Sequence, residues 1–308
     1  MAPRRRAEGG SAASTPAGDA LFGNASTEDV LPDSDAVLAW GLPRLRDLPW
    51  RRTRDPWAVL VSEVMAQQTQ VSRVVPKWLE FMERFPTPAA CAAAPLGDVL
   101  RLWQGLGYPR RAQGLHAAAG EVSRVGRFPD TLEALLELPG VGQYTARAVL
   151  AFAFETDAAV VDTNVGRVLA RHAGRRLTAR NCQSMADAAL PPGEPWAWNQ
   201  CLMELGATVC TAANPSCAAC PLRARCRWRG SGPDPAEGSA GVSRAQARFE
   251  GSDRQARGLL MRRLSDGAVC VDDAAQVMQR DVPTASRLVD ALVAEGLVRR
   301  VGTRLMLP

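Results

Sequence analysis

The stretch Leu138–Asn164, LPGVGQYTARAVLAFAFETDAAVVDTN, decides how the rest of the chain can be arranged. A capping-box pattern at Asp130–Glu133 predicts a helix before it. Gly140 and Gly142 then allow a tight turn, because glycine adopts positive φ angles at no steric cost. A second helix follows, and its N-terminal N–H groups suit a phosphate. An ordinary connection between two helices is the alternative interpretation of this turn. The carboxylate of Asp162 follows the second helix, after a run of residues that is either buried or strand-like.

Composition limits what class of protein this can be. The chain has 308 residues, of which 46% are hydrophobic, so it is long enough for two or three domains with real cores. No apolar run reaches the ~18 residues that a membrane span needs. The N-terminus has no apolar segment typical of a secretory signal. The net charge of +5 permits a nucleic-acid partner. We expect a monomer in the bacterial cytoplasm, associated with the nucleoid.

The kinds of basic residue limit the chemistry further. Lys77 is the single lysine in the sequence, and all other basic side chains except two histidines are arginines. Schiff-base catalysis needs an amine, and this chain offers one lysine side chain for it. The two histidines, His116 and His172, have no metal-ligand spacing between them.

A helix predicted over Trp57–Val71 carries the first candidate catalytic carboxylate. Its apolar residues recur at helical spacing, and Glu63 lies off that stripe. An isolated glutamate on a helix is usually solvated, but the amides of Gln67–Gln70 at the helix end suit hydrogen bonding to base edges. Upstream, Trp50 stands among arginines, a combination that can pack simply or hold a flat base by stacking.

A second candidate contact is the turn at residues 105–111, which holds two glycines, Tyr108 and paired arginines. This composition fits a turn that faces DNA. A helix terminator with a packed tyrosine is equally compatible with these residues.

Four cysteines form the candidate metal site: Cys210, Cys217, Cys220 and Cys226. Without an export signal, they indicate a metal site rather than disulfides. A structural zinc site usually has two CxxC pairs, whereas this loop has one, so zinc is the lesser alternative. The remaining cysteines are expected to be small buried hydrophobic side chains: Cys91, Cys182, Cys201 and Cys270.

The domain plan follows from shifts in composition. Residues 1–35 predict a disordered tail, residues 36–230 an ordered core and residues 231–250 a linker. In residues 251–308, three helical patterns precede a hairpin signal, which suggests a winged-helix-like module. A small packing or partner-binding domain is the alternative for that module.

Five motifs together resemble one family: RDLPWR at 46–51, SEVMAQQT at 62–69, GLGY at 105–108, the LPGVGQYTA string with VVDTN, and the cysteine loop. They are similar to those of MutY-type adenine DNA glycosylases of the helix–hairpin–helix, or endonuclease III, superfamily. The resemblance implies an all-α fold with two lobes and double-stranded DNA between them. One is a six-helix lobe at about 53–155, and the other combines 36–52 with 156–230 and carries a 4Fe–4S cluster on the cysteine loop. We expect a short form without the Nudix-like domain that usually ends such proteins.

The resemblance also implies roles for individual residues. It makes Glu63 the catalytic acid and Asp162 the carboxylate that stabilises positive charge on the sugar, with Tyr144 and Asn164 as candidates to orient them. Residues expected to contact DNA or the bases are Arg46, Leu48, Trp50, Arg51, Gln67, Gln68, Thr69, Tyr108, Gly140, Val141 and Gly142. The chain departs from the family pattern at Ala66, where an apolar leucine is usual, and at Pro109, where a second aromatic is frequent.

The expected function is monofunctional removal of adenine from pairs with 8-oxoguanine or guanine in base excision repair. One alternative is a mismatch thymine or uracil glycosylase, or an endonuclease III-like enzyme. Bifunctional members have a lysine where this chain has Tyr144, which disfavours a lyase. A noncatalytic iron–sulfur regulator that binds DNA is the alternative of another class.

Overall fold

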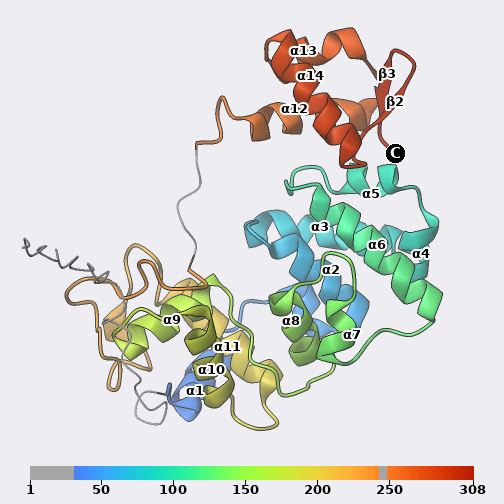
Figure 1. The fold of residues 1–308 in the computed structure, drawn as a ribbon. Coiled ribbons are helices and arrows are strands. Elements are labelled where there is room, and N and C mark those ends of the chain that lie inside the picture. The colour runs from blue at the N-terminus through green and yellow to red at the C-terminus, as the bar shows by residue number, and fades with distance from the viewer. Residues whose placement is uncertain (1–30, 243–247) are drawn as a thin grey trace, which may run out of the picture.

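The computed structural model describes residues 31–242 and 248–308 (Figure 1). Most of the expected tail and residues 243–247 of the expected linker therefore lie outside the described residues. The first helix begins at Ser34, slightly earlier than expected, because the Asp33 side chain caps it by accepting from the Ala36 backbone N–H at 3.1 Å. Among the described residues, no helix is both long and apolar enough to cross a membrane.

One lobe, here called the hairpin lobe, has seven helices, of which α2 is the central one. Its helices are α2 (Pro56–Ala66), α3 (Val71–Arg84), α4 (Pro88–Ala93), α5 (Leu96–Leu102), α6 (Arg110–Val125), α7 (Leu132–Leu136) and α8 (Gln143–Ala153). Helix α2 is buried on nearly every side, so its apolar residues form the centre of the core. Two indoles anchor it, since Trp57 donates to the Phe85 carbonyl at 2.9 Å and Trp78 donates to the Ala58 carbonyl at 3.0 Å.

The second lobe, here called the cysteine lobe, has a separate apolar core. Its helices are α1 (Ser34–Gly41), α9 (Thr163–Ala173), α10 (Ala179–Ala189) and α11 (Pro195–Thr208), with short 3-10 turns η2 (Leu42–Arg44), η3 (Pro49–Arg52) and η4 (Cys217–Ala219). The N-terminal helix α1 thus lies beside α11, far from it in sequence (Figure 1). Gly41 permits this approach, because a Cβ there would lie 2.5 Å from Cys201 Cβ.

Several boundaries differ from those that the sequence predicts. The helix expected to reach Val71 ends at Ala66, and the amides follow it in a turn where Gln68 has φ 54°. Thr131, not Asp130, caps the helix before the glycine turn. Helices α4 and α10 were not predicted. The run before Asp162 is extended but joins no strand, because its backbone bonds to a buried side chain on α11 instead.

The C-terminal module spans residues 253–308. It has three helices, α12 (Asp253–Asp266), α13 (Ala274–Met278) and α14 (Val282–Ala294), a 3-10 turn η5 (Val271–Asp273), and strands β1 (Val269–Cys270), β2 (Arg299–Val301) and β3 (Arg304–Met306). The strands form an antiparallel sheet in the order β1-β3-β2. The three helices and the hairpin are as predicted, whereas β1 was not anticipated. The apolar core of the module is continuous with that of the hairpin lobe.

The segment just after the cysteine loop is ordered where we expected a linker. The Ala240 N–H donates to the Leu177 carbonyl at 2.8 Å, and the Leu177 N–H donates to Ser239 Oγ at 3.0 Å. A Cβ at Gly166 would lie 3.2 Å from the Ala240 carbonyl oxygen, so α9 and this segment lie backbone to backbone. The chain is thereby held against the cysteine lobe as far as Gly241.

Candidate active site

A cleft of about 910 Å³ is lined by both lobes and contains most of the predicted site. Lining residues that the sequence singled out are Arg46, Leu48, Trp50, Arg51, Glu63, Gln67, Gln68, Thr69, Gly140, Gly142, Tyr144, Asp162 and Asn164. Tyr108 and Val141 do not line it. Val141 is instead a buried residue whose N–H donates to the Leu138 carbonyl within the turn.

Glu63 is a buried acid in this cleft. It lies on α2 with 9% of its surface exposed, and the Tyr144 hydroxyl from α8 donates to its Oε2 at 2.7 Å. Burial raises the pKa of Glu63 to about 7, and the nearby charge of Asp162 acts in the same direction. The hydrogen bond from Tyr144 opposes that rise. Glu63 can therefore hold a proton near neutral pH, as a general acid must.

Asp162 is a second buried carboxylate with a different environment. It is the N-cap of α9, so its Oδ1 accepts from the Val165 N–H at 2.7 Å, and its Oδ2 accepts from the Asn164 amide at 2.9 Å. Burial raises the pKa of Asp162, and these hydrogen bonds counteract the rise. Burial thus raises the pKa of both carboxyl groups, and the hydrogen bonds that Asp162 accepts from a backbone N–H and an amide favour its ionised form.

Arg167 joins Asp162 to the cysteine loop, and the sequence did not single it out. Its Nη2 donates to Asn164 Oδ1 at 2.8 Å, and its Nε donates to the Cys210 carbonyl at 2.7 Å. A chain of contacts therefore runs from Asp162 through Asn164 and Arg167 to Cys210. The spacing of Asn164 and Arg167, three residues apart on one helix, was the available signal.

The two arginines that flank Trp50 in sequence bond to buried side chains of α11. Glu204, almost fully buried, accepts from Arg46 Nε at 2.6 Å and from Arg51 Nη2 at 2.9 Å. Arg51 also donates to Gln200 Oε1 at 2.7 Å. Trp50 packs edge to face on the Trp78 ring, with centroids 6.0 Å apart. These contacts hold residues 46–51 in place at the border of the cleft.

Tyr108 does not line the cleft itself, but Arg111 links its turn to the amide turn that does. The Arg111 guanidinium donates to the Gln67 carbonyl at 2.5 Å and to the Leu106 carbonyl at 2.8 Å, so it joins the amide turn to the tyrosine turn. Tyr108 has φ 48° and is 38% exposed, which presents the ring at the surface. Arg111 was not predicted, since buried arginine hubs have no sequence pattern of their own.

The glycine turn has the geometry that a phosphate site requires. Gly140 has φ 77° and approaches α6 so closely that a Cβ at Gly114 would lie 3.2 Å from the Gly140 Cα. Helix α8 begins at Gln143, and its N-cap Gly142 offers no side chain to cover the first N–H groups. The helix N-terminus at the cleft therefore stays open to an anion.

The four cysteines of the loop line one small cavity of about 20 Å³. Burial raises the pKa of the Cys220 thiol to about 11, and the other three thiols add to that rise by their proximity. Within residues 31–242 and 248–308, no three Cys, His, Asp or Glu side chains are arranged to hold a single metal ion. The four thiols that line this cavity are the side chains of the loop that could hold a metal group.

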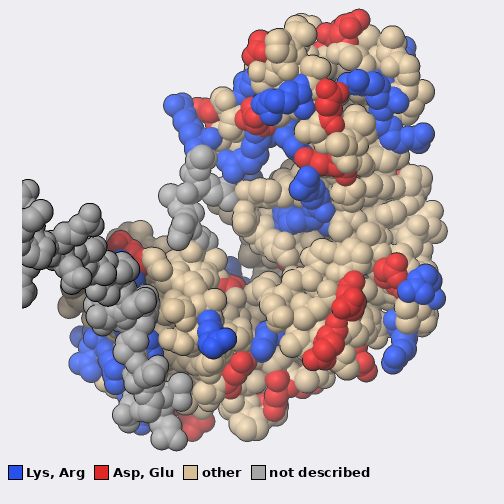
Figure 2. Space-filling view, in the orientation of Figure 1, with Lys and Arg blue, Asp and Glu red and all other residues tan. Residues whose placement is uncertain are grey.

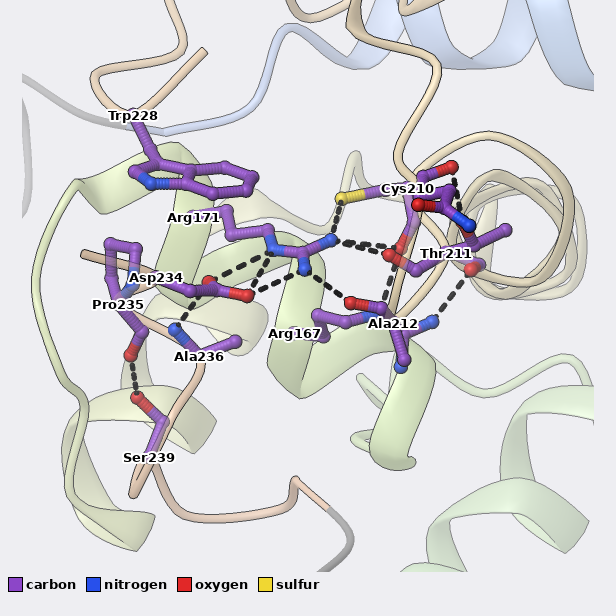
Figure 3. Close-up of polar contacts among 12 residues, drawn as sticks. Arg167, Arg171, Cys210, Thr211, Ala212, Trp228, Asp234, Pro235, Ala236 and Ser239 are labelled. Carbon is purple, nitrogen blue, oxygen red and sulfur yellow. Dashed lines mark hydrogen bonds and ion pairs between the residues drawn. The ribbon is translucent and has the colours of Figure 1, made fainter. Parts of the chain in front are cut away.

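Arg171 is the polar centre of this loop (Figure 3). Its guanidinium donates to Cys210 Sγ at 3.4 Å, pairs with Asp234 at 2.6 Å and lies 4.5 Å from the centre of the Trp228 ring. Two loop carbonyls also accept from it, Thr211 at 2.7 Å and Ala212 at 3.0 Å. A buried positive charge is thus fixed beside a candidate ligand.

Comparison with known proteins agrees with this geometry. Residues 61–190 match the family model described as HhH-GPD superfamily base excision DNA repair protein. Adenine DNA glycosylase of Mycolicibacterium smegmatis is 45% identical over 273 residues, which cover 86% of this chain and 92% of that protein. The structure is similar to a thermostable thymine-DNA glycosylase, with TM-score 0.59 and 28% identity over 64% of this chain and 94% of the other. An endonuclease III–DNA complex matches with TM-score 0.55 and 26% identity over 62% and 91%.

Proposed function

Because the chain belongs to the adenine DNA glycosylase family of the HhH-GPD superfamily, we propose that it removes adenine paired with 8-oxoguanine or guanine. The observation that carries this proposal is the pair of buried carboxyl groups in the cleft, Glu63 and Asp162. The pKa of Glu63 is raised to about 7, and the oxygens of Asp162 accept hydrogen bonds that favour its ionised form.

The proposed reaction is hydrolysis of the bond between adenine and deoxyribose. Adenine leaves poorly until a ring nitrogen is protonated, and protonated Glu63 supplies that proton. As the bond breaks, both its electrons go to the base, and the sugar acquires oxocarbenium character. The Asp162 carboxylate stabilises that positive charge. A water molecule adds to the sugar carbon, and its proton passes to the Glu63 carboxylate, which restores the acid.

The remaining residues of the cleft take positioning roles in this proposal. Tyr144 orients Glu63, and Asn164 orients Asp162, through the hydrogen bonds that each makes. The open N-terminus of α8 binds a phosphate of the DNA backbone. Gln68 and Tyr108 enter the base stack beside the target pair. Trp50 lines the part of the cleft that receives the extruded adenine.

We assign a 4Fe–4S cluster to the cysteine loop, held by Cys210, Cys217, Cys220 and Cys226. The four thiols that line one cavity, and a loop with one CxxC pair where structural zinc sites usually have two, support a cluster over zinc. When bound, the cluster would fix the fold of the loop rather than take part in hydrolysis. The loop in turn would hold Arg167, whose Nε bonds to the Cys210 carbonyl, and through it Asn164.

Strand cleavage after base loss is not part of the proposal, because a lyase needs an amine near the sugar. The second position after Gly142 is Tyr144, whose hydroxyl donates to Glu63 Oε2. Lys77 lies on α3 and pairs with Glu80 at 2.9 Å, and it does not line the cleft.

The function is tested with duplexes that hold adenine opposite 8-oxoguanine, adenine opposite guanine, thymine opposite guanine, and thymine glycol. We expect excision of adenine from the first two and no covalent adduct on borohydride treatment. Preferential release of thymine would favour the thymine glycosylase alternative. A borohydride adduct that persists in Lys77→Ala would reveal an amine outside the proposed mechanism, and binding without any excision would favour a noncatalytic regulator.

A further inference from the structure

The C-terminal module is fixed on the hairpin lobe. The Gly97 N–H donates to the Pro308 carbonyl at 2.9 Å, and Gln113 Nε2 donates to the Glu295 carbonyl at 2.8 Å. The Glu295 carboxylate, mostly buried, also pairs with Arg110 of the hairpin lobe at 3.1 Å and with Arg257 of the module. With a shared apolar core as well, the module keeps one orientation relative to the cleft.

The place where the module is fixed lies next to the predicted base-contacting turns. Gln68 lines the cleft, and Arg111 joins its turn to that of Tyr108. On the far side of Tyr108 lies Arg254 in the first turn of α12, whose Nη1 donates to the tyrosine hydroxyl at 3.4 Å. Direct contacts therefore join the cleft to the tyrosine turn, and the tyrosine turn to the start of α12.

This edge of the module carries arginines from more than one element. Arg287 of α14 pairs with Asp253 at the start of α12 at 2.7 Å, and both side chains are more than half exposed. Such exposed pairs contribute little and are readily exchanged for another anion. Figure 2 shows arginine side chains over α12 and over the adjoining part of the hairpin lobe.

We propose that this edge, Arg254 with Arg287, binds phosphates of the duplex beside the base pair that Tyr108 enters. The partner is double-stranded DNA, recognised by backbone charge rather than by sequence. The inference rests on the proposed function, because it takes the DNA path along the cleft from that function. The module is then part of the DNA-binding surface. Its contacts with the hairpin lobe hold Arg254 and Arg287 in a fixed position relative to the turns of Gln68 and Tyr108, so that all of them can contact the same duplex.

The test measures the salt dependence of duplex binding, which reports the number of phosphate contacts. Binding of the full chain to a duplex with a stable abasic analogue opposite guanine is followed between about 50 and 200 mM salt. Arg254→Ala and Arg287→Ala should each weaken binding and reduce the log–log slope by about 0.9. Arg304→Ala is the matched control, because it removes the same charge from the β2–β3 hairpin, at the other end of the module (Figure 1).

Arg254→Lys separates charge from structure, since it keeps the charge and should keep the slope. Unchanged slopes in both alanine variants, or an equal loss in Arg304→Ala, would overturn the proposal. A lower melting temperature with an unchanged slope would also overturn it, because Arg254 would then serve the docking alone. Excision is not needed for this measurement, so failure of the proposed activity would be seen separately in the wild-type glycosylase assay.

Discussion

The Tyr144 hydroxyl donates to Glu63 Oε2 at 2.7 Å, and these two residues lie on different helices, α8 and α2. This bond joins the helix that follows the glycine turn to the central helix of the hairpin lobe. Asp162 lies in the same cleft, and its charge contributes to the raised pKa of Glu63. The protonation state of one side chain therefore depends on three segments that are distant in sequence.

Replacing the acid should remove activity without removing DNA binding. Glu63→Gln keeps the shape of the side chain but cannot supply a proton, so single-turnover adenine excision should be lost while duplex affinity stays within a few fold. Asp162→Asn should behave alike through loss of negative charge near the sugar. Excision by Glu63→Gln at a rate comparable to wild type would refute the assignment.

Removing the tyrosine hydroxyl should shift the pH dependence of excision. The hydrogen bond from Tyr144 lowers the pKa of Glu63, so Tyr144→Phe should raise that pKa further. Because the protonated form is the active one, the alkaline limb of the rate profile should move to higher pH. Measuring single-turnover rates from about pH 5 to 9 tests this. An alkaline limb that moves to lower pH would contradict the proposed role.

Burial of Glu63 should also make stability depend on pH. Its pKa is raised from 4.5 to about 7 in the folded chain, so the folded state favours the protonated form. The stability associated with that proton is fully present below pH ~4.5 and is lost as pH rises through about 7. Glutamine does not ionise, so Glu63→Gln avoids this loss. At pH 8 the free energy of unfolding of the variant should exceed that of the wild type by about 1–3 kcal/mol. Urea titrations at pH 5 and 8 measure the difference, which should be much smaller at pH 5.

Recognition of the opposite base should depend on Gln68 and Tyr108. Each stacking contact is worth ~1–3 kcal/mol, so Gln68→Ala and Tyr108→Ala should each reduce the preference for adenine opposite 8-oxoguanine over guanine roughly tenfold. The ratio of excision rates on the two duplexes is the measurement. Removing the C-terminal module would be a poor comparison, because its core is continuous with the hairpin lobe. If both variants keep the wild-type ratio while Arg254→Ala loses it, the module reads the lesion.

The charges beside the cysteine loop should set the properties of a bound cluster. Hydrogen bonds to sulfur and local charge tune such potentials. Arg171→Gln removes a positive charge near Cys210 and should lower the reduction potential, whereas Asp234→Asn removes the compensating negative charge and should raise it. Iron analysis followed by voltammetry of the purified protein measures both. If the two variants shift the reduction potential in the same direction, or do not shift it, Arg171 and Asp234 have a purely structural role.

The sequence alone determined the helical class, the glycine turn, the two carboxylates and the cysteine loop. These features are local: a turn needs two glycines, and a metal site needs its ligands at short spacing. The three helices and the hairpin of the C-terminal module were likewise predictable from periodicity and turn residues. The helix end at Ala66 was not predicted, because apolar and amide residues there are equally compatible with a longer helix.

The tertiary structure decided which side chains act together. Arg111, Arg167 and Arg171 each bond to groups from segments far away in the sequence, and no periodic pattern distinguishes them from the many solvated arginines of this chain. The raised pKa of Glu63 likewise comes from burial and from Asp162, neither of which is a property of the motif. The position of the C-terminal module beside Tyr108 follows from burial of apolar surface shared with the hairpin lobe. Such couplings depend on distance in space, and a sequence pattern records only distance along the chain.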